Sequence, residues 1–186
     1  MTRLYIIAAT LNAWVLIAIL AAAFLVQFVL GELPCPLCVL QRVGLMLCAL
    51  GPLQLLIRNA RGGLTDRDIA VACGMSVLAG LLGATMATRQ VLLHILPGDP
   101  GYGSPVFGLH LYTWSLMTFL AHMLAAGLML TTTVWLRTPV EEPWRATIPT
   151  LIAFALVVVA NLLAVIALAG LHWNLPPDPQ RYLLFG

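Results

Sequence analysis

The chain contains no lysine and few charged residues of any kind. Of its 186 residues, 9% are charged and 61% are hydrophobic, and the mean hydropathy is +0.99. This composition excludes an ordinary soluble domain, in which about 25% of residues are charged. The nine basic residues are all arginines, scattered mostly at the ends of apolar segments, which excludes the clustered basic surface typical of nucleic-acid binding. The sequence therefore predicts an integral membrane protein that contacts lipid and binds no nucleic acid.

Long runs without charge recur along the chain. Each is long enough to cross a hydrocarbon core of roughly 30 Å, which needs about 20 helical residues. The first run exceeds the roughly 7–15 apolar residues of a cleaved signal peptide, so we expect a retained span. The predicted spans are residues 4–30, 35–57, 69–93, 109–136 and 148–171. They predict an all-α membrane protein in which residues 1–186 form a single domain, one bundle of five transmembrane helices.

Arginine is distributed unequally between the two sides of the membrane that these spans define. Six of the nine arginines fall on one side, in the N-terminus and in segments 58–68 and 137–147. The positive-inside rule assigns this side, with the N-terminus, to the cytoplasm. The opposite side holds residues 31–38, the loop 94–108 and the C-terminal tail. In a bacterial cell that outer compartment permits disulfide bonds.

The outer loop 94–108 is rich in proline and glycine, which exclude a regular helix. We expect it to fold as a compact cap. A plain connection between two spans is the alternative, and composition alone favours it over a functional lid.

Two cysteines separated by two residues occur where the second span begins, in the stretch GELPCPLCVLQRVG. Pro34 and Pro36 fit a helix entrance, because the first amides of a helix have no intrahelical partner and proline lacks that N–H group. In the first turn the helix dipole and free amides favour an anion, and therefore the thiolate form of Cys38. A step of about 100° per residue places Cys35, Cys38 and Arg42 on one face of the helix.

A cysteine pair of this spacing can be redox-active, metal-binding or structural. Zinc normally requires four ligands in a tetrahedral set. Cys48 lies about ten residues, roughly 15 Å, deeper than Cys38, and Cys73 begins the next span from the cytoplasmic side. We therefore predict that Cys48 and Cys73 are small, buried packing residues.

The histidines leave a second metal alternative open. His94, His110 and His172 lie at the outer ends of their segments, on the same side as the cysteine pair. A mixed cysteine and histidine site, or a haem, is compatible with that placement. No two histidines show a ligand spacing, however, and His122 lies deeper and alone. We predict no metal.

Arg42 is a permanent cation inside a predicted membrane span, which is costly unless it faces protein, water or an anion. One interpretation is that its guanidinium extends to nearby lipid headgroups. The other is that it stabilises a thiolate, or an electron acceptor that becomes negative on reduction. Gln41 falls on another sector of the same helix, so we expect it to pack there or to support those groups.

The stretch Pro34-Cys35-Pro36-Leu37-Cys38-Val39-Leu40-Gln41-Arg42 resembles the DsbB family of bacterial membrane proteins that generate disulfide bonds. Members carry P-C-x-L-C-x-x-x-R at the outer start of their second span. Two further segments are similar to the family: Arg89-Gln90-Val91 followed by Leu96-Pro97, and Phe107-Gly108-Leu109 with Trp114. Together the resemblance covers residues 5–136.

The resemblance implies a thiol:quinone oxidoreductase of the bacterial inner membrane. A periplasmic thioredoxin-like dithiol protein would be oxidised, and its electrons would pass through the catalytic Cys35 and Cys38 to ubiquinone or menaquinone. By this resemblance Cys35 exchanges with the incoming thiol, Cys38 faces the quinone, and Arg42 and Gln90 bind the quinone. Thiol chemistry agrees with these roles, because exchange needs an accessible thiolate and the quinone carries the two-electron step.

Two features depart from the family pattern. Members that oxidise a soluble thioredoxin-like protein usually carry a second cysteine pair in the second outer loop, and the loop here contains no cysteine. A fifth span also follows where a four-helix core would end. Two alternatives therefore stay open. One is a quinone-docking subunit or anchor of a periplasmic redox complex, without thiol oxidase activity of its own. The other is a structural partner in which the pair is a staple.

Overall fold

The computed structural model describes residues 2–62, 64–132, 146–170 and 175–185. Within them the chain forms no strand and five helices, each long and apolar enough to cross a membrane. The helices are α1 Thr2–Val29, α2 Pro36–Ala60, α3 Asp66–Leu93, α4 Leu111–Thr132 and α5 Thr147–Ala169. The predicted all-α class is confirmed. The predicted ends of the fourth and fifth spans, at residues 136 and 171, lie outside the described residues.

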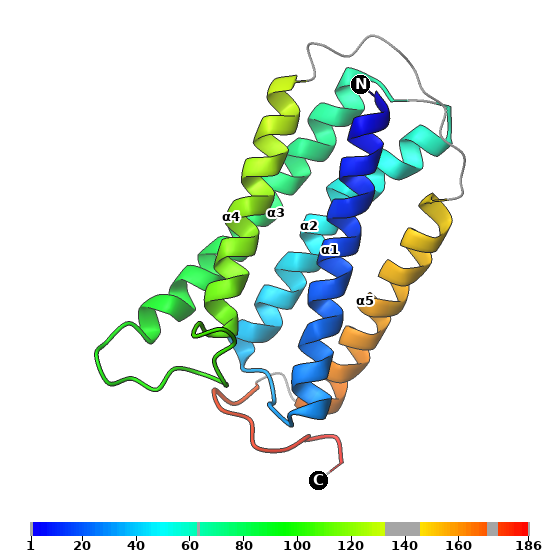
Figure 1. The fold of residues 1–186 in the computed structure, drawn as a ribbon. Helices are drawn as coiled ribbons and strands as arrows, with labels where there is room; N and C mark the ends of the chain where they lie inside the picture. The colour runs from blue at the N-terminus through cyan, green and yellow to red at the C-terminus, as the bar shows by residue number, and fades with distance from the viewer. Residues whose placement is uncertain (1, 63, 133–145, 171–174, 186) are drawn as a thin grey trace.

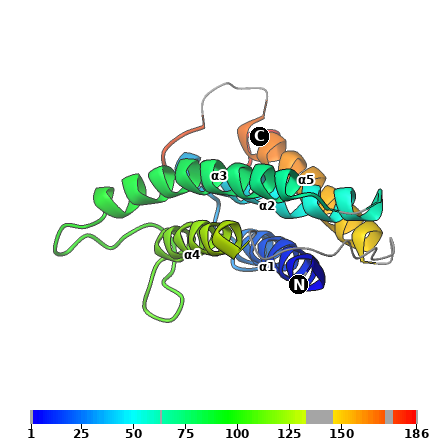
Figure 2. The same cartoon turned by 90° about the horizontal axis from the view of Figure 1, so that it is seen from above.

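The helices pack in two layers, with α2 and α3 in one and α1 and α4 in the other (Figure 2). α2 packs most extensively against α3, α4 packs against α3, and α1 packs against α2. α5 lies along α1 and α2, outside the group of four (Figure 1). This agrees with a four-helix core to which a fifth helix has been added.

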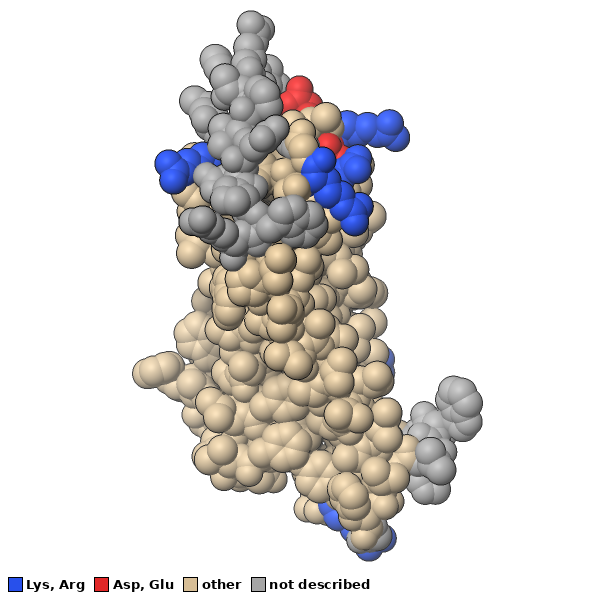
Figure 3. All heavy atoms as spheres, turned by 90° about the vertical axis from the view of Figure 1, so that its right-hand side faces the viewer, with Lys and Arg blue, Asp and Glu red and all other residues tan. Residues whose placement is uncertain are grey.

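The bundle has two chemically different ends. The cysteine end, as we call it, carries residues 30–38, the loop 94–110 and the tail 175–185, and the arginine end carries the N-terminus and the α2–α3 connection (Figure 1). Among the described residues, the arginine end holds Arg3, Arg58, Arg61 and Arg67. Figure 3 shows most of the basic side chains on this face gathered at that end, above a belt almost free of charge. Arg137 and Arg145 lie outside the described residues.

Local sequence determines where α2 and α3 begin. Cys35 is the N-cap of α2, and Pro36 is its first helical residue, where proline sacrifices no hydrogen bond. Thr65 caps α3 in a capping box with Asp68. Asp68 also accepts a hydrogen bond of 2.7 Å from the Arg58 guanidinium. The connection between α2 and α3 is therefore tied at both of its ends.

Glycines allow α2, α3 and α4 to approach closely near the cysteine end. A Cβ atom at Gly44 would lie 3.0 Å from the Cα of Gly83, and a Cβ at Gly83 would overlap the ring of Phe119. Phe119 is fully buried. Small residues at helix contacts are how membrane helices gain close packing, since lipid provides little hydrophobic drive for association.

Replacing Gly83 with alanine should therefore push α4 away from α3. We expect Gly83→Ala to lower the free energy of unfolding by about 1–3 kcal/mol, as overpacking of a filled core does. Gly74→Ala on the same helix is the matched control, because no atom lies within 4 Å of its added Cβ. Reversible unfolding of the purified proteins in mixed micelles measures both. Equal stability of the two variants would contradict this packing.

Candidate functional site

Cys35 and Cys38 lie in direct contact at the start of α2. Their sulfur atoms are 2.6 Å apart, and the backbone N–H of Cys38 donates to Cys35 Sγ over 3.2 Å. Cys35 is buried, with 5% of its surface exposed, and Cys38 is half-buried. The hydrogen bond to the Cys38 side chain, and then burial, raise the pKa of the Cys35 thiol above its usual value. Two thiols this close can form a disulfide without backbone movement.

Gln90 of α3 faces both sulfur atoms. Its Nε2 donates to Cys35 Sγ over 3.4 Å and to Cys38 Sγ over 3.5 Å. Its Oε1 accepts a hydrogen bond of 2.7 Å from Gln41 Nε2. The same oxygen lies 3.9 Å from Cys38 Sγ and can accept from that thiol, while the bond from Gln41 orients the amide so that its NH₂ group also faces the sulfurs. A thiolate is an acceptor that such a donor stabilises.

Arg42 reaches across to α1. Its guanidinium donates to Gln27 Oε1 over 2.6 Å and to the carbonyl oxygen of Ala23 over 3.1 Å, and it lies 5.8 Å from the ring centroid of Phe24. Only 9% of Arg42 is exposed. This burial supports the interpretation that Arg42 faces protein, and it speaks against extension to lipid headgroups.

Gln27 connects Arg42 to the C-terminal tail. It is 1% exposed, and its Nε2 donates to the hydroxyl of Tyr182 over 3.3 Å. The Tyr182 ring stacks on Phe28 of α1. The backbone amides of Leu183 and Leu184 donate to the last carbonyls of α5. The tail thus returns over the end of α1 and joins the polar groups below the cysteine pair.

A cavity of about 350 Å³ lies beneath the cysteine pair, between α1, α2 and α4. Its polar lining comes from α2, the two loops and α4: Cys38, Gln41, Arg42, Glu32, Tyr102, Ser115 and Thr118. Aliphatic and aromatic residues form most of the remaining wall, among them Ile19, Ala22, Val26, Leu45 and Trp114. This size and lining are typical of a small-molecule site, which is mostly apolar with a few placed polar groups. We call it the cysteine-end cavity. Gln90 lies against the sulfurs and does not line it.

The loop between α3 and α4 folds back onto the segment that precedes the cysteine pair. The Tyr102 hydroxyl donates to the carbonyl oxygen of Leu33 over 2.6 Å, and burial raises the pKa of that hydroxyl. The Glu32 carboxylate accepts from the Ser104 amide at 3.1 Å and 3.2 Å. The expected compact cap is therefore present, and Tyr102 also lines the cysteine-end cavity.

The outer histidines take part in this loop. His94 Nδ1 lies 3.0 Å from Asp99 Oδ1, and His110 Nδ1 lies 3.0 Å from the carbonyl oxygen of Gly103. Both rings stack on Tyr112. His172 lies outside the described residues. Among the residues that the structure describes, no group of three or more histidines, cysteines or carboxylates could hold a metal ion.

Sequence reasoning placed Cys35, Cys38, Arg42 and Gln90 at one site, and the structure brings all four together around the start of α2. It missed Gln27 and Tyr102. A signal for Gln27 was available, because an amide side chain in an otherwise apolar span usually faces the bundle interior and a polar partner. Cys48 and Cys73 are buried, as expected for packing residues.

Comparison with known proteins shows which protein family this sequence matches. The family described as "Disulfide bond formation protein DsbB" matches residues 5–104. Disulfide bond formation protein B of Chromobacterium violaceum is 46% identical over 77 residues, covering 41% of this chain and 44% of that protein. Disulfide bond formation protein B 1 of Pseudomonas fluorescens Pf-5 is 37% identical over 81 residues, covering 44% and 45%. The chain thus spans less than half the length of these two relatives.

A longer match is to Disulfide bond formation protein B 1 of Burkholderia lata. It is 34% identical over 142 residues, covering 62% of this chain and 82% of that protein. No solved structure matches the chain.

Gln27→Leu tests whether Gln27 satisfies the buried guanidinium. We expect it to lower the free energy of unfolding by about 1.5–3 kcal/mol, the range for a hydrogen bond to a charged group. Gln54→Leu on α2 is the control, since Gln54 Oε1 has no partner among the described residues. Chemical unfolding in micelles gives both values. A loss for Gln27→Leu no larger than that for Gln54→Leu would show that this bond is not needed.

Tyr102→Phe tests whether the loop covers Cys35. Removing one hydrogen bond, with a net value of about 1 kcal/mol, should raise the alkylation rate of Cys35 by about fivefold. The rate is measured with a membrane-impermeant maleimide in a Cys38→Ser background. Tyr5→Phe is the control, because Tyr5 also loses a tyrosine hydrogen bond, to Thr132, at the opposite end of the bundle. An unchanged rate in Tyr102→Phe would contradict the covering role.

Proposed function

Because the chain belongs to the DsbB family of membrane proteins for disulfide bond formation, we propose that it transfers electrons from a periplasmic dithiol protein to a membrane quinone. As a member with five apolar helices it is a multi-pass inner-membrane protein. One observation carries the proposal: two thiols are in contact, and one of them, Cys38, lines a mostly apolar cavity together with a buried guanidinium. The combination joins a thiol-exchange site to a site for a lipid-soluble molecule.

The residues of the cysteine-end cavity fit a quinone. Most of its wall is apolar, with a few polar groups, and its volume of about 350 Å³ suits a substituted ring. Arg42 has five N–H groups, and its bonds to Gln27 and Ala23 leave donors free to face the cavity. Arg42 would hold the quinone, with Trp114 and Tyr112 forming part of the wall. When bound, the quinone supplies the two-electron acceptor.

The cysteine pair exchanges with the partner in two steps. A partner thiolate attacks Cys35 Sγ of the Cys35–Cys38 disulfide, which forms a mixed disulfide and releases Cys38 as a thiolate. The second partner thiol then attacks the mixed disulfide and releases Cys35, so the partner leaves oxidised and the pair is a dithiol. Gln90 stabilises the released thiolate through its NH₂ group. The pair returns to a disulfide when two electrons and two protons leave it for the bound acceptor.

The partner must reach Cys35 directly. The loop 94–110 contains no cysteine that could relay electrons. Cys35 is 5% exposed, and Tyr102 of that loop is bonded to Leu33, two residues before it. We therefore propose that the loop opens, or is displaced by the partner, before exchange. The arginines of the opposite end support a periplasmic position for the cysteine end, by the positive-inside rule.

Quinol formation from a dithiol tests the proposal. The purified protein, given dithiothreitol and a short-chain ubiquinone, should reduce the quinone catalytically. We expect Cys38→Ser to abolish turnover and Arg42→Ala to lower kcat/KM by about 10- to 100-fold, the value of a charged hydrogen bond. Cys48→Ala is the control, because Cys48 does not line the cysteine-end cavity and should leave the rate unchanged. Quinol absorbance follows the reaction.

Two results would overturn parts of this function. If the wild-type protein forms no quinol with any dithiol, the proposed thiol:quinone oxidoreductase activity is wrong. A quinone-docking subunit of a larger redox complex then becomes the better interpretation. If Cys38→Ser keeps its activity, the electron-donating sulfur has been assigned wrongly.

A further inference from the structure

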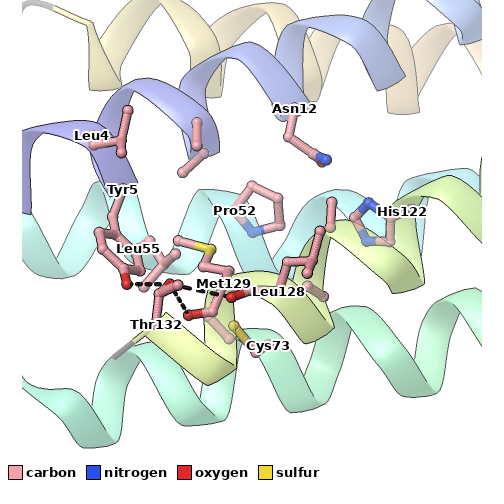
Figure 4. A pocket seen from close by; sticks show the side chains of 15 residues that line it. Leu4, Tyr5, Asn12, Pro52, Leu55, Cys73, His122, Leu128, Met129 and Thr132 are labelled. Carbon is pink, nitrogen blue, oxygen red and sulfur yellow. Dashed lines mark hydrogen bonds between the residues drawn. The ribbon is translucent and has the colours of Figure 1, made fainter. Parts of the chain in front are cut away.

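A second cavity lies in the half of the bundle nearer the arginine end. It has a volume of about 450 Å³ and is formed by residues of α1, α2, α3 and α4. Figure 4 shows it from close by, with α1 and α4 on opposite sides. Among the described residues no charged side chain lines it, and most of its wall is aliphatic. Leu4 and Leu128 at its rim are 66% and 60% exposed, so it opens between α1 and α4 toward the lipid.

Polar atoms without a partner face this cavity. His122 of α4 is 5% exposed, and within the described residues neither of its ring nitrogens has a hydrogen-bond partner. The same is true of Asn12 Oδ1 on α1. Figure 4 shows both side chains lining the same space. The other polar pair is satisfied internally, because the Tyr5 hydroxyl lies 2.6 Å from Thr132 Oγ1.

Buried polar groups in proteins are almost always hydrogen-bonded, and the exceptions require an explanation. Water alone explains this site poorly. At about 30 Å³ per molecule the cavity has room for about 15 waters, while its wall offers few polar atoms to hold them. An apolar cavity of about 150 Å³ holds one benzene, so this one has room for a ring together with a substituent or chain.

We propose that this cavity binds a neutral, membrane-soluble molecule that carries a hydroxyl group on an apolar ring or chain. Neutrality follows because none of the described residues that line the cavity is charged. The hydroxyl follows from the unpaired atoms: Asn12 Oδ1 needs a donor, and the neutral imidazole of His122 offers one donor and one acceptor. A hydroxyl group provides both functions, whereas a fully oxidised quinone has acceptors only.

The site is separate from the thiol chemistry. Cys35, Cys38, Arg42 and Gln90 do not line it. Two sources share the required chemistry: a phenolic headgroup, of which a quinol is one example, and a lipid with a free hydroxyl, such as a diacylglycerol. The inference therefore holds or fails independently of quinone reduction at the other end.

Binding of 4-nonylphenol to the full-length protein in lipid nanodiscs tests the site, with its methyl ether as the probe that lacks the hydroxyl donor. We expect saturable binding of the phenol above that of empty discs, and binding of the ether at least about tenfold weaker. Ala125→Phe should abolish phenol binding because Ala125 lines the cavity. Ala121→Phe is the matched control, one turn away on α4 and outside the lining, and it should bind normally.

His122→Phe adds a chemical control, since it should remove the preference for phenol over ether. In ¹⁵N-histidine spectra the phenol should shift the one imidazole signal that is missing in His122→Phe. Cys38→Ser should bind the phenol like the wild type, which separates this result from failure of the thiol reaction. Competition with a short-chain ubiquinol and with dioleoylglycerol then identifies the source.

Three results would overturn the proposal: no saturable binding above empty discs, equal binding of phenol and ether by the wild type, or full binding by Ala125→Phe. The first would mean that the cavity holds only water or lipid chains.

Discussion

A permanent positive charge within a membrane helix needs polar partners inside the protein, since hydrocarbon offers none. Arg42, six residues into α2, obtains them from α1, through Gln27 Oε1 and the carbonyl oxygen of Ala23. This requirement fixes how α1 meets α2 at the cysteine end. The cysteine-end cavity lies between these helices and α4, so the arrangement that satisfies the guanidinium also places Arg42 in the wall of this cavity.

The opposite side of α2 is organised by a second polar contact. Gln41 donates to Gln90, and Gln90 faces both thiols. The close approach of α2 and α3 at Gly44 and Gly83 permits that contact. The thiol pair therefore stands between an amide donor on α3 and a cavity on the α1 side. Polar groups at this end are paired among themselves, whereas at the other cavity both ring nitrogens of His122 and Oδ1 of Asn12 have no hydrogen-bond partner among the described residues. We therefore propose different ligands for the two cavities.

Sequence alone predicted much of this. Hydropathy gave five spans, because length and apolarity are what the membrane demands of a helix. The cysteine spacing, its prolines and Arg42 predicted a thiol site at a helix start, and local rules for capping and helical phase suffice for that. The partners of Arg42 and Gln90 could not be predicted. Gln27, the partner of Arg42, and Gln41, the partner of Gln90, lie on other helices than the residues they bind. Only the packing of the helices decides which of these side chains meet. The hydrogen bond from Tyr102 of the loop to Leu33 is likewise a contact between distant segments. The composition of the loop does not predict such a contact.

The central claim is that the contacting pair Cys35 and Cys38 delivers its electrons to a quinone held in the cysteine-end cavity. A single-turnover reaction tests it most directly: fully reduced protein is mixed with one equivalent of a short-chain ubiquinone, without any partner, and quinol and disulfide are measured together. The account predicts one quinol for each disulfide, with peptide mass spectrometry locating that bond between Cys35 and Cys38. Quinol formation without this disulfide, or a disulfide that involves Cys48 or Cys73, would contradict it.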